Sequence, residues 1–533
     1  MKATYLLSLI IIFFTACKAQ PVNTKGTARD TTITAGNSFS ELFLDSIKLE
    51  TFIAAAELTD TAANRLRNFY NSRNYQFAWF TKDGLAEQTR VFLNLHNNYI
   101  QLANDSSMGD KHLHEQMNQL SDEDTAVSAA NNKITILELQ LTGHFFKFVQ
   151  HAYAGRVNPG ELQWHIPRKK VNVMALLDTL IANKGQKTEQ WEPVNRQYKL
   201  MNKELRRYAD IKKAGGWNVI VSGNHKPYNP GDEAILVKQL KQRLATDGRY
   251  NTKDTSEAFG IELLAAVKQA QKQYGIKQDG IITAALVKEL NVPLEDRIEQ
   301  LLVNMERMRW MPEEPAGNRI MANIPDFKLH VFEKTKKVFD MDIVVGTDAN
   351  KTVIFNDILQ FIVFSPYWNV PPSIVRKEIL PGINRNSNYL ANKNMEQTGR
   401  ENGLPVIRQK PGGENSLGRV KFIFPNSYNI YFHDTPSKSL FDNRNRAFSH
   451  GCIRVAHPEK LAQYLLRNQP EWTVDKIDKA MNLNKENWVK LKEPMPVFIT
   501  YFTAWVDNDG LMNFRNDVYG NDKKLAAHLF EHQ

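Results

Sequence analysis

The sequence predicts a multidomain α+β protein with a helical N-terminal half, a small three-helix unit and a mainly β C-terminal domain. At 533 residues the chain exceeds one ordinary domain, and its 42% hydrophobic content is enough for several cores. Apolar residues recur every three or four positions before residue 215, whereas Val, Ile and Phe fill short runs of strand length after residue 320. This change of period separates the two kinds of structure.

The N-terminus predicts export. MKATYLLSLIIIFFTAC joins the cationic Lys2 to an apolar run that is too short to span a bilayer, so we expect a signal peptide over residues 1–17. The small residues before Cys17 resemble a bacterial lipoprotein cleavage site, and this resemblance implies that Cys17 is lipidated. An ordinary signal peptide is the alternative. The polar residues 18–39 then predict a flexible tether.

Two helical regions follow. We expect a helical scaffold domain over residues 40–220, because stretches such as ITILELQLTGHFFKFVQ have helical spacing. A compact unit is expected over residues 225–295, where Leu236, Leu240 and Leu244 are four residues apart. Its Leu/Gln helix, its YGIKQDGIIT turn and its closing Leu-Asn resemble the three-helix peptidoglycan-binding module of cell-wall enzymes. A plain helical domain is the alternative.

A connecting helix is expected over residues 296–319, and a mainly β domain over residues 320–525. Runs such as KVFDMDIVVGT and MPVFITYFTAWVD have strand length and end in Gly, Pro or Asp-Asn turns. A helical or irregular stretch at 373–396 interrupts the strands, so we expect an insertion near residues 366–415.

Charge and spacing exclude two classes of partner. The net charge is +10, yet the chain has no Lys/Arg run and no RNA- or DNA-binding motif, so nucleic acid is not an expected partner. No paired Cys/His spacing is present, so no metal site is expected.

The stretch AFSHGCIRV suggests chemistry. If Cys17 is acylated, Cys452 has no cysteine left to pair with, so it does not serve as a disulfide. A catalytic thiolate needs a base and donors for an oxyanion. Gly451 allows close backbone approach, and Arg454 shares a strand face with Cys452 if the segment is extended. His450 and His433 are both candidates for the base.

The longer stretch HDTPSKSLFDNRNRAFSHGCIRV resembles the signature of the L,D-transpeptidase (YkuD-type) catalytic domain. NIPDFKLHVFE, FSPYWNVPPSIVRKEILP and SLGRVKFIFPN resemble the large multidomain periplasmic members of that family. The resemblance implies that Cys452 is the nucleophile and that His433, ahead of His450, is the general base.

The resemblance implies further roles around the cysteine. His450 and Gly451 would line the oxyanion site, and Ser449 would orient the motif by hydrogen bonding. Arg454 would hold the site together or contact a carboxylate of the stem peptide. Tyr367 and Trp368 would face the substrate from the start of a flap, with a core position in the β domain as the alternative.

The implied function is a cysteine acyltransferase of cell-wall biogenesis and cell shape. It would form 3→3 cross-links between peptidoglycan stem peptides through a thioester, and it would react with carbapenems. Its partners would be the stem peptides, the glycan and, through the lipid anchor, a membrane of the periplasm or envelope; no metal or organic cofactor is required. The alternatives are an L,D-carboxypeptidase and a non-catalytic wall-binding scaffold lipoprotein. A papain-like peptidase fits poorly, because its His would lie far downstream of its Cys.

Overall fold

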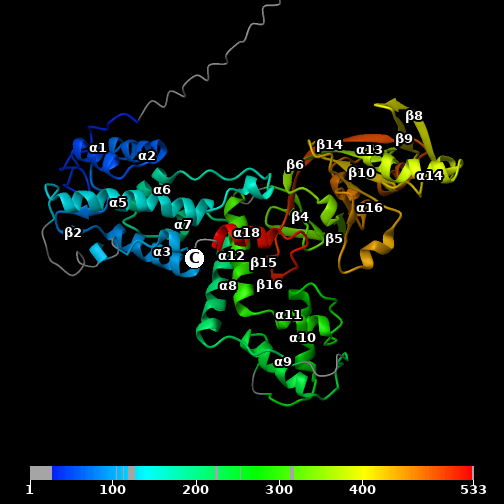
Figure 1. Cartoon of the computed structure of the whole chain (residues 1–533), viewed down its shortest axis with the longest axis horizontal. Helices are drawn as coiled ribbons and strands as arrows, with labels where there is room; N and C mark the ends of the chain where they lie inside the picture. Colours follow the sequence, from blue (N-terminus) through cyan, green and yellow to red (C-terminus); the bar gives the residue numbers. More distant parts are fainter. Residues whose placement is uncertain are drawn as a thin grey trace, which may run out of the picture. The chain divides into compact units, whose positions relative to one another are not determined.

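The computed structural model (Figure 1) describes residues 27–103, 105–111, 113, 115–117, 127–221, 226–251, 254–312 and 317–530. The predicted signal peptide, Cys17 and the first part of the expected tether lie outside the described residues. The chain forms two compact units: the first comprises residues up to 92, 110–146 and 174–186, and the second comprises residues 93–109, 147–173 and 187 onward. No helix in the described ranges is both long and apolar enough to cross a membrane.

The first unit is built from helices around one buried carboxyl group. Its elements include α1 (Ser46–Ala55), α2 (Asp60–Asn71), the hairpin β1 (Phe80–Thr81) and β2 (Gly84–Leu85), the first turns of α3 (Glu87–Ala103), most of α5 (Asn132–Val149) and α6 (Val173–Ala182). Glu138 on α5 accepts hydrogen bonds from the backbone N–H groups of Ala78 (2.6 Å) and Trp79 (3.0 Å) and from the Tyr70 hydroxyl (2.8 Å). The Glu138 carboxylate therefore accepts hydrogen bonds from backbone N–H groups of a buried turn that lies outside the helices and the hairpin.

Part of the expected tether lies against this unit. The Thr27 N–H donates to Asn68 Oδ1, and the Asp30 N–H donates to the carbonyl of Asn71, each at 3.0 Å. These bonds attach residues 27–30 to the C-terminal half of α2.

Two helices organise the second unit. α8 (Arg196–Lys213) begins at Asn195, whose side chain accepts the Tyr198 N–H, and it buries Tyr198, Met201, Leu205, Tyr208 and Ile211 on one stripe. α12 (Leu294–Trp310) is buried over most of its length. Its Glu306 accepts hydrogen bonds from the Arg156 and Val157 N–H groups and from Arg309. This buried charge is thus paired and fully hydrogen-bonded.

The three-helix unit precedes α12. It contains α9 (Ile235–Thr246), α10 (Ile261–Gln273) and α11 (Ala284–Leu290). Leu236, Leu240 and Leu244, at the predicted spacing, are buried. The turn at Gly280 has a φ of +81° and its N–H donates to Gln271 (2.8 Å), so the left-handed turn is closed by a side chain of α10.

The C-terminal domain is a closed, mainly antiparallel sheet. Its strands are β3 (Arg319–Asn323), β4 (Lys328–Glu333), β5 (Lys336–Gly346), β6 (Phe355–Phe364), β10 (Val420–Ile423), β11 (Phe432–His433), β12 (Ala447–Ser449), β13 (Ile453–Val455) and β14 (Asn487–Thr500). They are ordered β12-β5-β13-β11-β10-β6-β14-β3-β4, and β4 also pairs with β5. The side chains of Ile362, Phe422 and Phe432, on three neighbouring strands, are fully buried on the inner face of the sheet. The pairing of β4 with β5 closes the sheet, so the other face of each strand points outward.

Shorter elements complete this domain. They are α16 (Pro458–Leu465), α17 (Val474–Ala480), the hairpin β15 (Ala504–Val506) and β16 (Met512–Phe514), and α18 (Asn521–Phe530). The predicted fold class is therefore confirmed: a helical N-terminal region, a small helical module and a mainly β domain, as Figure 1 shows.

An insertion follows β6 and forms a flap. It contains β7 (Trp368–Asn369), α13 (Pro372–Ile374), the π-helical turn η5 (Val375–Ile379), α14 (Leu380–Arg385), α15 (Tyr389–Asn392), β8 (Met395–Glu401) and β9 (Leu404–Gln409). Its three strands form a separate sheet, ordered β7-β9-β8. Val370, Ile374, Val375, Ile379 and Ile407 form its own small core. The flap is therefore stabilised largely by its own contacts.

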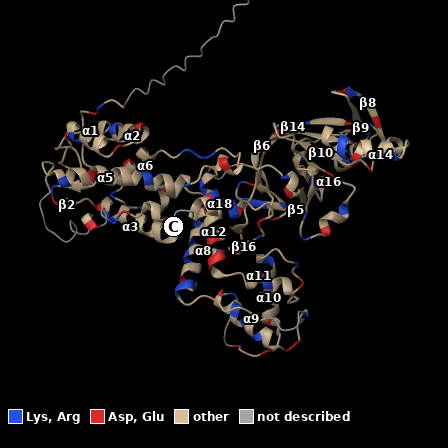
Figure 2. Cartoon of the chain, viewed as in Figure 1, with Lys and Arg blue, Asp and Glu red and all other residues tan. Residues whose placement is uncertain are grey.

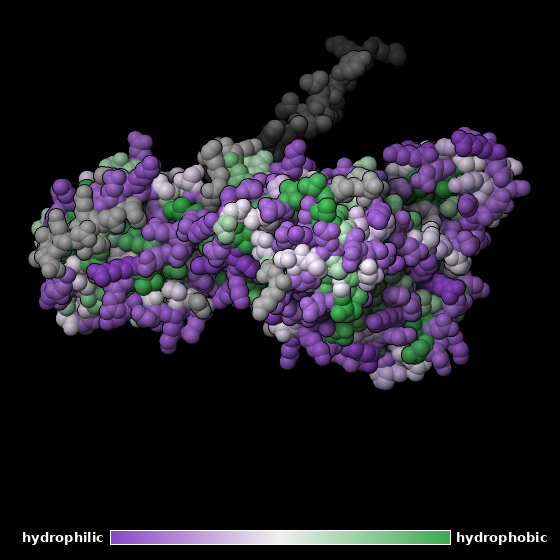
Figure 3. Space-filling view, turned by 90° about the horizontal axis from the view of Figure 1, so that it is seen from below, coloured by the Kyte–Doolittle hydropathy of each residue, from purple (hydrophilic) through white to green (hydrophobic). Residues whose placement is uncertain are grey.

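Charge and apolar surface are both dispersed. Figure 2 shows Lys and Arg interspersed with Asp and Glu along the elements. On the face drawn in Figure 3, hydrophobic residues form separate patches among hydrophilic ones.

Candidate active site

Three neighbouring strands bring the predicted nucleophile and base to one face. β11 runs parallel to β13 with His433 opposite Arg454, and β10 runs antiparallel to β11 with Lys421 opposite His433. Alternate residues of a strand share a face, so Tyr431 lies beside His433, and Cys452 lies beside Arg454 if the strand geometry extends one residue before β13. The sheet thus gathers Cys452, Tyr431, His433, Lys421 and Arg454, although they come from three separate stretches of sequence.

The turn between β12 and β13 shapes the backbone around the thiol. The Ser449 hydroxyl donates to the Cys452 carbonyl (2.6 Å) and accepts the Gly451 N–H (3.1 Å). Gly451 has a φ of +113°, which favours glycine, and its carbonyl accepts a hydrogen bond from Thr352 (2.8 Å). The N–H of Gly451, which the sequence suggested for the oxyanion site, is therefore engaged by Ser449 in this structure.

The Cys452 thiol is partly buried and donates to the carbonyl of Asn429 at 3.6 Å. No hydrogen bond joins it to the His433 ring in the part of the chain that the structure describes. Burial raises the pKa of the Cys452 thiol, against hydrogen bonds from Tyr431 and the charges of Lys421 and Arg454, which lower it. The thiol is therefore protonated at neutral pH and needs a base.

His433 has the protonation state that a base requires. Its ring is buried, and burial together with the nearby charge of Arg454 lowers the pKa of His433 to about 3. Its Nδ1 lies 2.5 Å from the carbonyl of Asp434. A carbonyl only accepts, so Nδ1 carries the proton and Nε2 is left as the basic nitrogen. The imidazole is thus neutral, with its tautomer fixed.

The turn after His433 is anchored by Asp434. Its carboxylate accepts the Arg419 N–H (2.9 Å) and the Lys438 ammonium (2.7 Å). Gly418 passes so close that an added Cβ would lie 2.4 Å from the Asp434 carboxyl group. A side chain at residue 418 would displace the carboxylate, and with it the carbonyl that orients His433.

Sequence reasoning missed two residues of this cluster, Lys421 and Tyr431. The Lys421 ammonium lies 4.1 Å from the centre of the Tyr431 ring, and that ring lies 5.8 Å from His433. Burial lowers the pKa of Lys421. The alternation in RVKFIF and in NIYFHD predicts that Lys421 and Tyr431 lie on the face opposite the buried apolar residues, but it does not predict that either residue lies near Cys452.

Arg454 lies opposite His433 in the pairing of β13 with β11. Burial lowers the pKa of Arg454, and its Nε is buried without a hydrogen-bond partner among the described residues. Together Arg454 and Lys421 leave a surplus of positive charge beside the thiol.

His450 takes a different position from His433. Its ring is 58% exposed, and its Nε2 lies 3.6 Å from Glu378 of the flap. The sequence resemblance put His433 ahead of His450 as the base, and the burial, the tautomer and the sheet position of His433 also favour it.

The two flap aromatics contact other residues of the flap, and Tyr367 also contacts Glu486 just before β14. The Arg408 guanidinium lies 4.1 Å from the centre of the Tyr367 ring, and the Tyr367 N–H donates to Glu486 (3.4 Å). Trp368 pairs with Gln409 and packs on the flap core. Their predicted contact with substrate stays a prediction.

Metal chemistry has no support from side-chain clusters here. Among the residues that the structure describes, no group of three or more His, Cys, Asp or Glu side chains is arranged to hold an ion.

Comparison with protein families assigns the domain around this site. Residues 317–479 match the YkuD family, described as the L,D-transpeptidase catalytic domain. The C-terminal domain is an L,D-transpeptidase catalytic domain. Residues 64–205 match a family described as "Scaffold domain", and residues 235–290 match one described as "Putative peptidoglycan binding domain". The family resemblances of the catalytic domain and of the three-helix module are therefore confirmed.

Individual relatives carry the same name. The chain is 30% identical over 242 residues to a Haemophilus influenzae protein named "Putative L,D-transpeptidase", an alignment that covers 43% of this chain. This chain spans 49% of the length of that relative. Among solved structures, L,D-transpeptidases of Xylanimonas cellulosilytica (14% identity, TM-score 0.17) and Stackebrandtia nassauensis (14%, 0.23) each cover 52% of this chain and 100% and 97% of their own. TM-scores this low add nothing to the sequence match.

Proposed function

We propose that the protein is a peptidoglycan L,D-transpeptidase that forms 3→3 cross-links through a thioester on Cys452. The observation that supports this most strongly is the pairing of β11 with β13, in which His433 lies opposite Arg454, two residues after Cys452. A neutral imidazole with a free Nε2 is suited to take a thiol proton.

The first half-reaction breaks one peptide bond. In this mechanism the Cys452 thiol turns away from the Asn429 carbonyl, and Nε2 of His433 takes its proton. The sulfur attacks the carbonyl carbon of the third residue of a donor tetrapeptide stem. The bond to the terminal D-alanine breaks, and the imidazolium protonates the departing amine. The backbone N–H of Cys452 is a donor for the oxyanion.

The second half-reaction forms the cross-link. The side-chain amine of an acceptor stem attacks the thioester carbonyl, His433 accepts the proton of that amine, and the sulfur leaves and is reprotonated. Arg454 and Lys421 offset the negative charge of the thiolate and of a stem carboxylate. If water attacks instead, the same site acts as an L,D-carboxypeptidase. The reaction is an acyl transfer and uses no metal or organic cofactor.

Two experiments test this function. Mass spectrometry after exposure to meropenem should find a covalent adduct on Cys452 in the wild type and none in Cys452→Ala. A folded wild type without an adduct would favour a non-catalytic wall-binding scaffold. Incubation with purified muropeptides, followed by chromatography, should give dimers; only shortened stems would indicate the carboxypeptidase.

The location of the protein is part of the same proposal. A lipid on Cys17 and the polar residues that follow it would attach the enzyme to a membrane of the envelope, where the peptidoglycan lies. Labelling with a fatty-acid analogue should mark the wild type and not Cys17→Ser.

A further inference from the structure

The site face continues beyond the reacting residues onto two neighbouring strands. β10 pairs with β6, and β6 pairs with β14, so the registers define rows of side chains that run across the sheet from the strands of the site. One row contains Arg454, His433, Lys421, Val363 and Trp488. Alternation then places a second row on the same face: Cys452, Tyr431, Ile423, Phe361 and Lys490.

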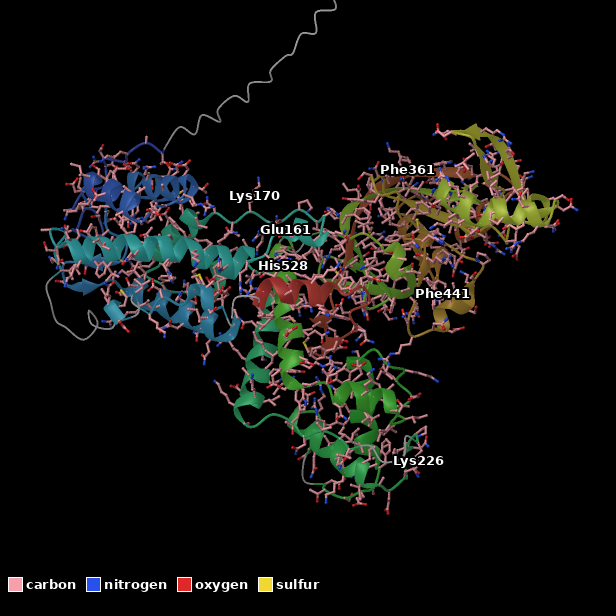
Figure 4. All side chains as sticks on the ribbon, in the orientation of Figure 1. Glu161, Lys170, Lys226, Phe361, Phe441 and His528 are labelled. Atoms are coloured by element: carbon pink, nitrogen blue, oxygen red, sulfur yellow. The ribbon has the colours of Figure 1, made fainter. Side chains whose placement is uncertain are left out.

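The far end of these rows carries the exposed Trp488 beside the partly buried Phe361. Trp488 is 54% exposed although it lies on β14, an interior strand of the nine-stranded sheet. The rings of Trp488 and Phe361 are 6.0 Å apart and meet edge to face. Phe361 is labelled in Figure 4. Their chain neighbours Val489 and Ile362 point inward and are buried, so the outward position of the pair follows from the register and not from a loose end.

We propose that Trp488 and Phe361 form a subsite for the sugar of a stem-peptide substrate, an N-acetylated hexosamine. The inference rests on the proposed function, since it concerns the glycan end of the same substrate. An exposed aromatic ring such as that of Trp488 can stack on the apolar C–H face of a pyranose, and the edge-to-face contact with Phe361 fixes the orientation of that ring.

The distance supports the sugar. Phe361 is three strand spacings from Cys452 along its row, or about 14 Å. The three stem residues from the reacting carbonyl back to the sugar span roughly 10 Å when extended. A sugar ring attached beyond them therefore reaches the aromatic pair, while the stem peptide crosses Tyr431 and Ile423.

The charges along the path fit the same occupant. Lys421 lies between the thiol and the pair, and Lys490 lies at the end of the second row. These cations flank a path for a stem that carries carboxylates, whereas the aromatic pair itself offers no charge to a peptide. Lys421 therefore faces the peptide part of the path, and Lys490 lies beside Phe361 at the sugar end.

Binding to the full-length Cys452→Ala chain tests this without catalysis. We expect the disaccharide-tetrapeptide to bind about tenfold more tightly than the sugar-free tetrapeptide, a difference of about 1.4 kcal/mol. Adding Trp488→Ala should remove that difference, and Trp488→Phe should retain most of it. Val474→Ala, at another exposed apolar residue (61% exposed), is the matched control and should leave the difference intact. Any glycan binding by the three-helix module is common to all variants.

The outcomes separate this inference from the function on which it rests. If Trp488→Ala weakens both ligands equally, the pair contacts peptide and the sugar subsite is wrong. If the tenfold preference persists in Trp488→Ala, the sugar binds elsewhere, and the inference is also wrong. A failure of the proposed function would appear instead as a wild-type chain that forms no thioester with either ligand, whatever the binding results.

Discussion

At the residue scale, the state of His433 decides how the thiol is activated. Because burial and Arg454 lower the pKa of His433 to about 3, while burial raises the pKa of Cys452, the reactive pair of neutral imidazole and thiol predominates across neutral pH. We expect the rate of meropenem acylation to change less than about twofold between pH 5 and 8. An ordinary histidine base would lose about tenfold in rate for each pH unit well below its pKa of about 6.5.

The control for this pH profile is His433→Gln, which should slow acylation by roughly two to four orders of magnitude. His450→Gln should stay within a few-fold of the wild type, because that ring is exposed and paired with Glu378. A rate that declines steeply below pH 6.5, or an inactive His450→Gln beside an active His433→Gln, would contradict the assignment.

A glycine outside the signature also constrains the base. Gly418 has a φ of +63°, and the Asp434 side chain occupies the space that a Cβ at residue 418 would need. Gly418→Ala should lower acylation at least tenfold, because Asp434 must move and its carbonyl orients His433. Gly413→Ala is the control, since nothing lies within 4 Å of its Cβ position. Equal rates in the two variants would show that the Asp434 turn does not position the ring.

Some of these residues could be predicted from the sequence and others could not. Cys452 and His433 were accessible because a rare unpaired thiol and a histidine at a strand end carry chemistry by residue type. Lys421 and Tyr431 carry no such signal alone; they join the site only when the register of β10 and β11 is known. A single sequence does not specify strand register, because one residue of slip moves each side chain to the other face.

At the element scale, the flap is expected to open as a unit. Ile407 is 1% exposed within a core that the flap forms by itself. Removing its side chain costs about 2–5 kcal/mol, and that loss should remain local. Ile407→Ala should therefore speed amide hydrogen exchange across β8 and β9 while leaving the melting temperature of the catalytic domain unchanged.

The matched variant is Ile362→Ala, a fully buried residue of the main sheet, which should lower that melting temperature by several degrees. Comparable melting shifts in the two variants would mean that flap and sheet unfold together. The insertion itself was predictable from the break in strand pattern at 373–396. Its separate core was not, because the apolar residues of α13, η5 and β9 become neighbours only through folding.

At the scale of the whole molecule, the three-helix module is part of the second unit. The rings of Tyr274 and Phe514 stack at 6.0 Å, and the Arg515 guanidinium donates to the Gln273 carbonyl (2.9 Å). The order of the domains could be predicted from the sequence, because the hydrophobic period differs between segments. The contacts between the module and the catalytic domain could not be predicted, because they join residues more than 200 positions apart and no local pattern indicates them.

The division into two compact units predicts two thermal transitions, one for each unit. The melting temperature of the first unit should depend on the protonation of Glu138. Burial raises the pKa of Glu138 to about 7, from an ordinary value near 4.5. Below pH 4.5 this carboxyl is protonated in both the folded and the unfolded states. Between pH 4.5 and 7 the unfolded state loses the proton while the folded state keeps it, so the free energy of unfolding falls as pH rises. Above pH 7 the loss levels off.

Calorimetry from pH 4.5 to 8 should therefore show the transition of the first unit moving to lower temperature as pH rises. In Glu138→Gln that unit should melt lower overall, because an amide serves the N–H groups of Ala78 and Trp79 less well, but its melting temperature should no longer depend on pH in this range. Glu57→Gln, at an exposed carboxyl of the same unit, should keep the wild-type slope. A slope that survives in Glu138→Gln would mean that another group of the first unit takes up the proton.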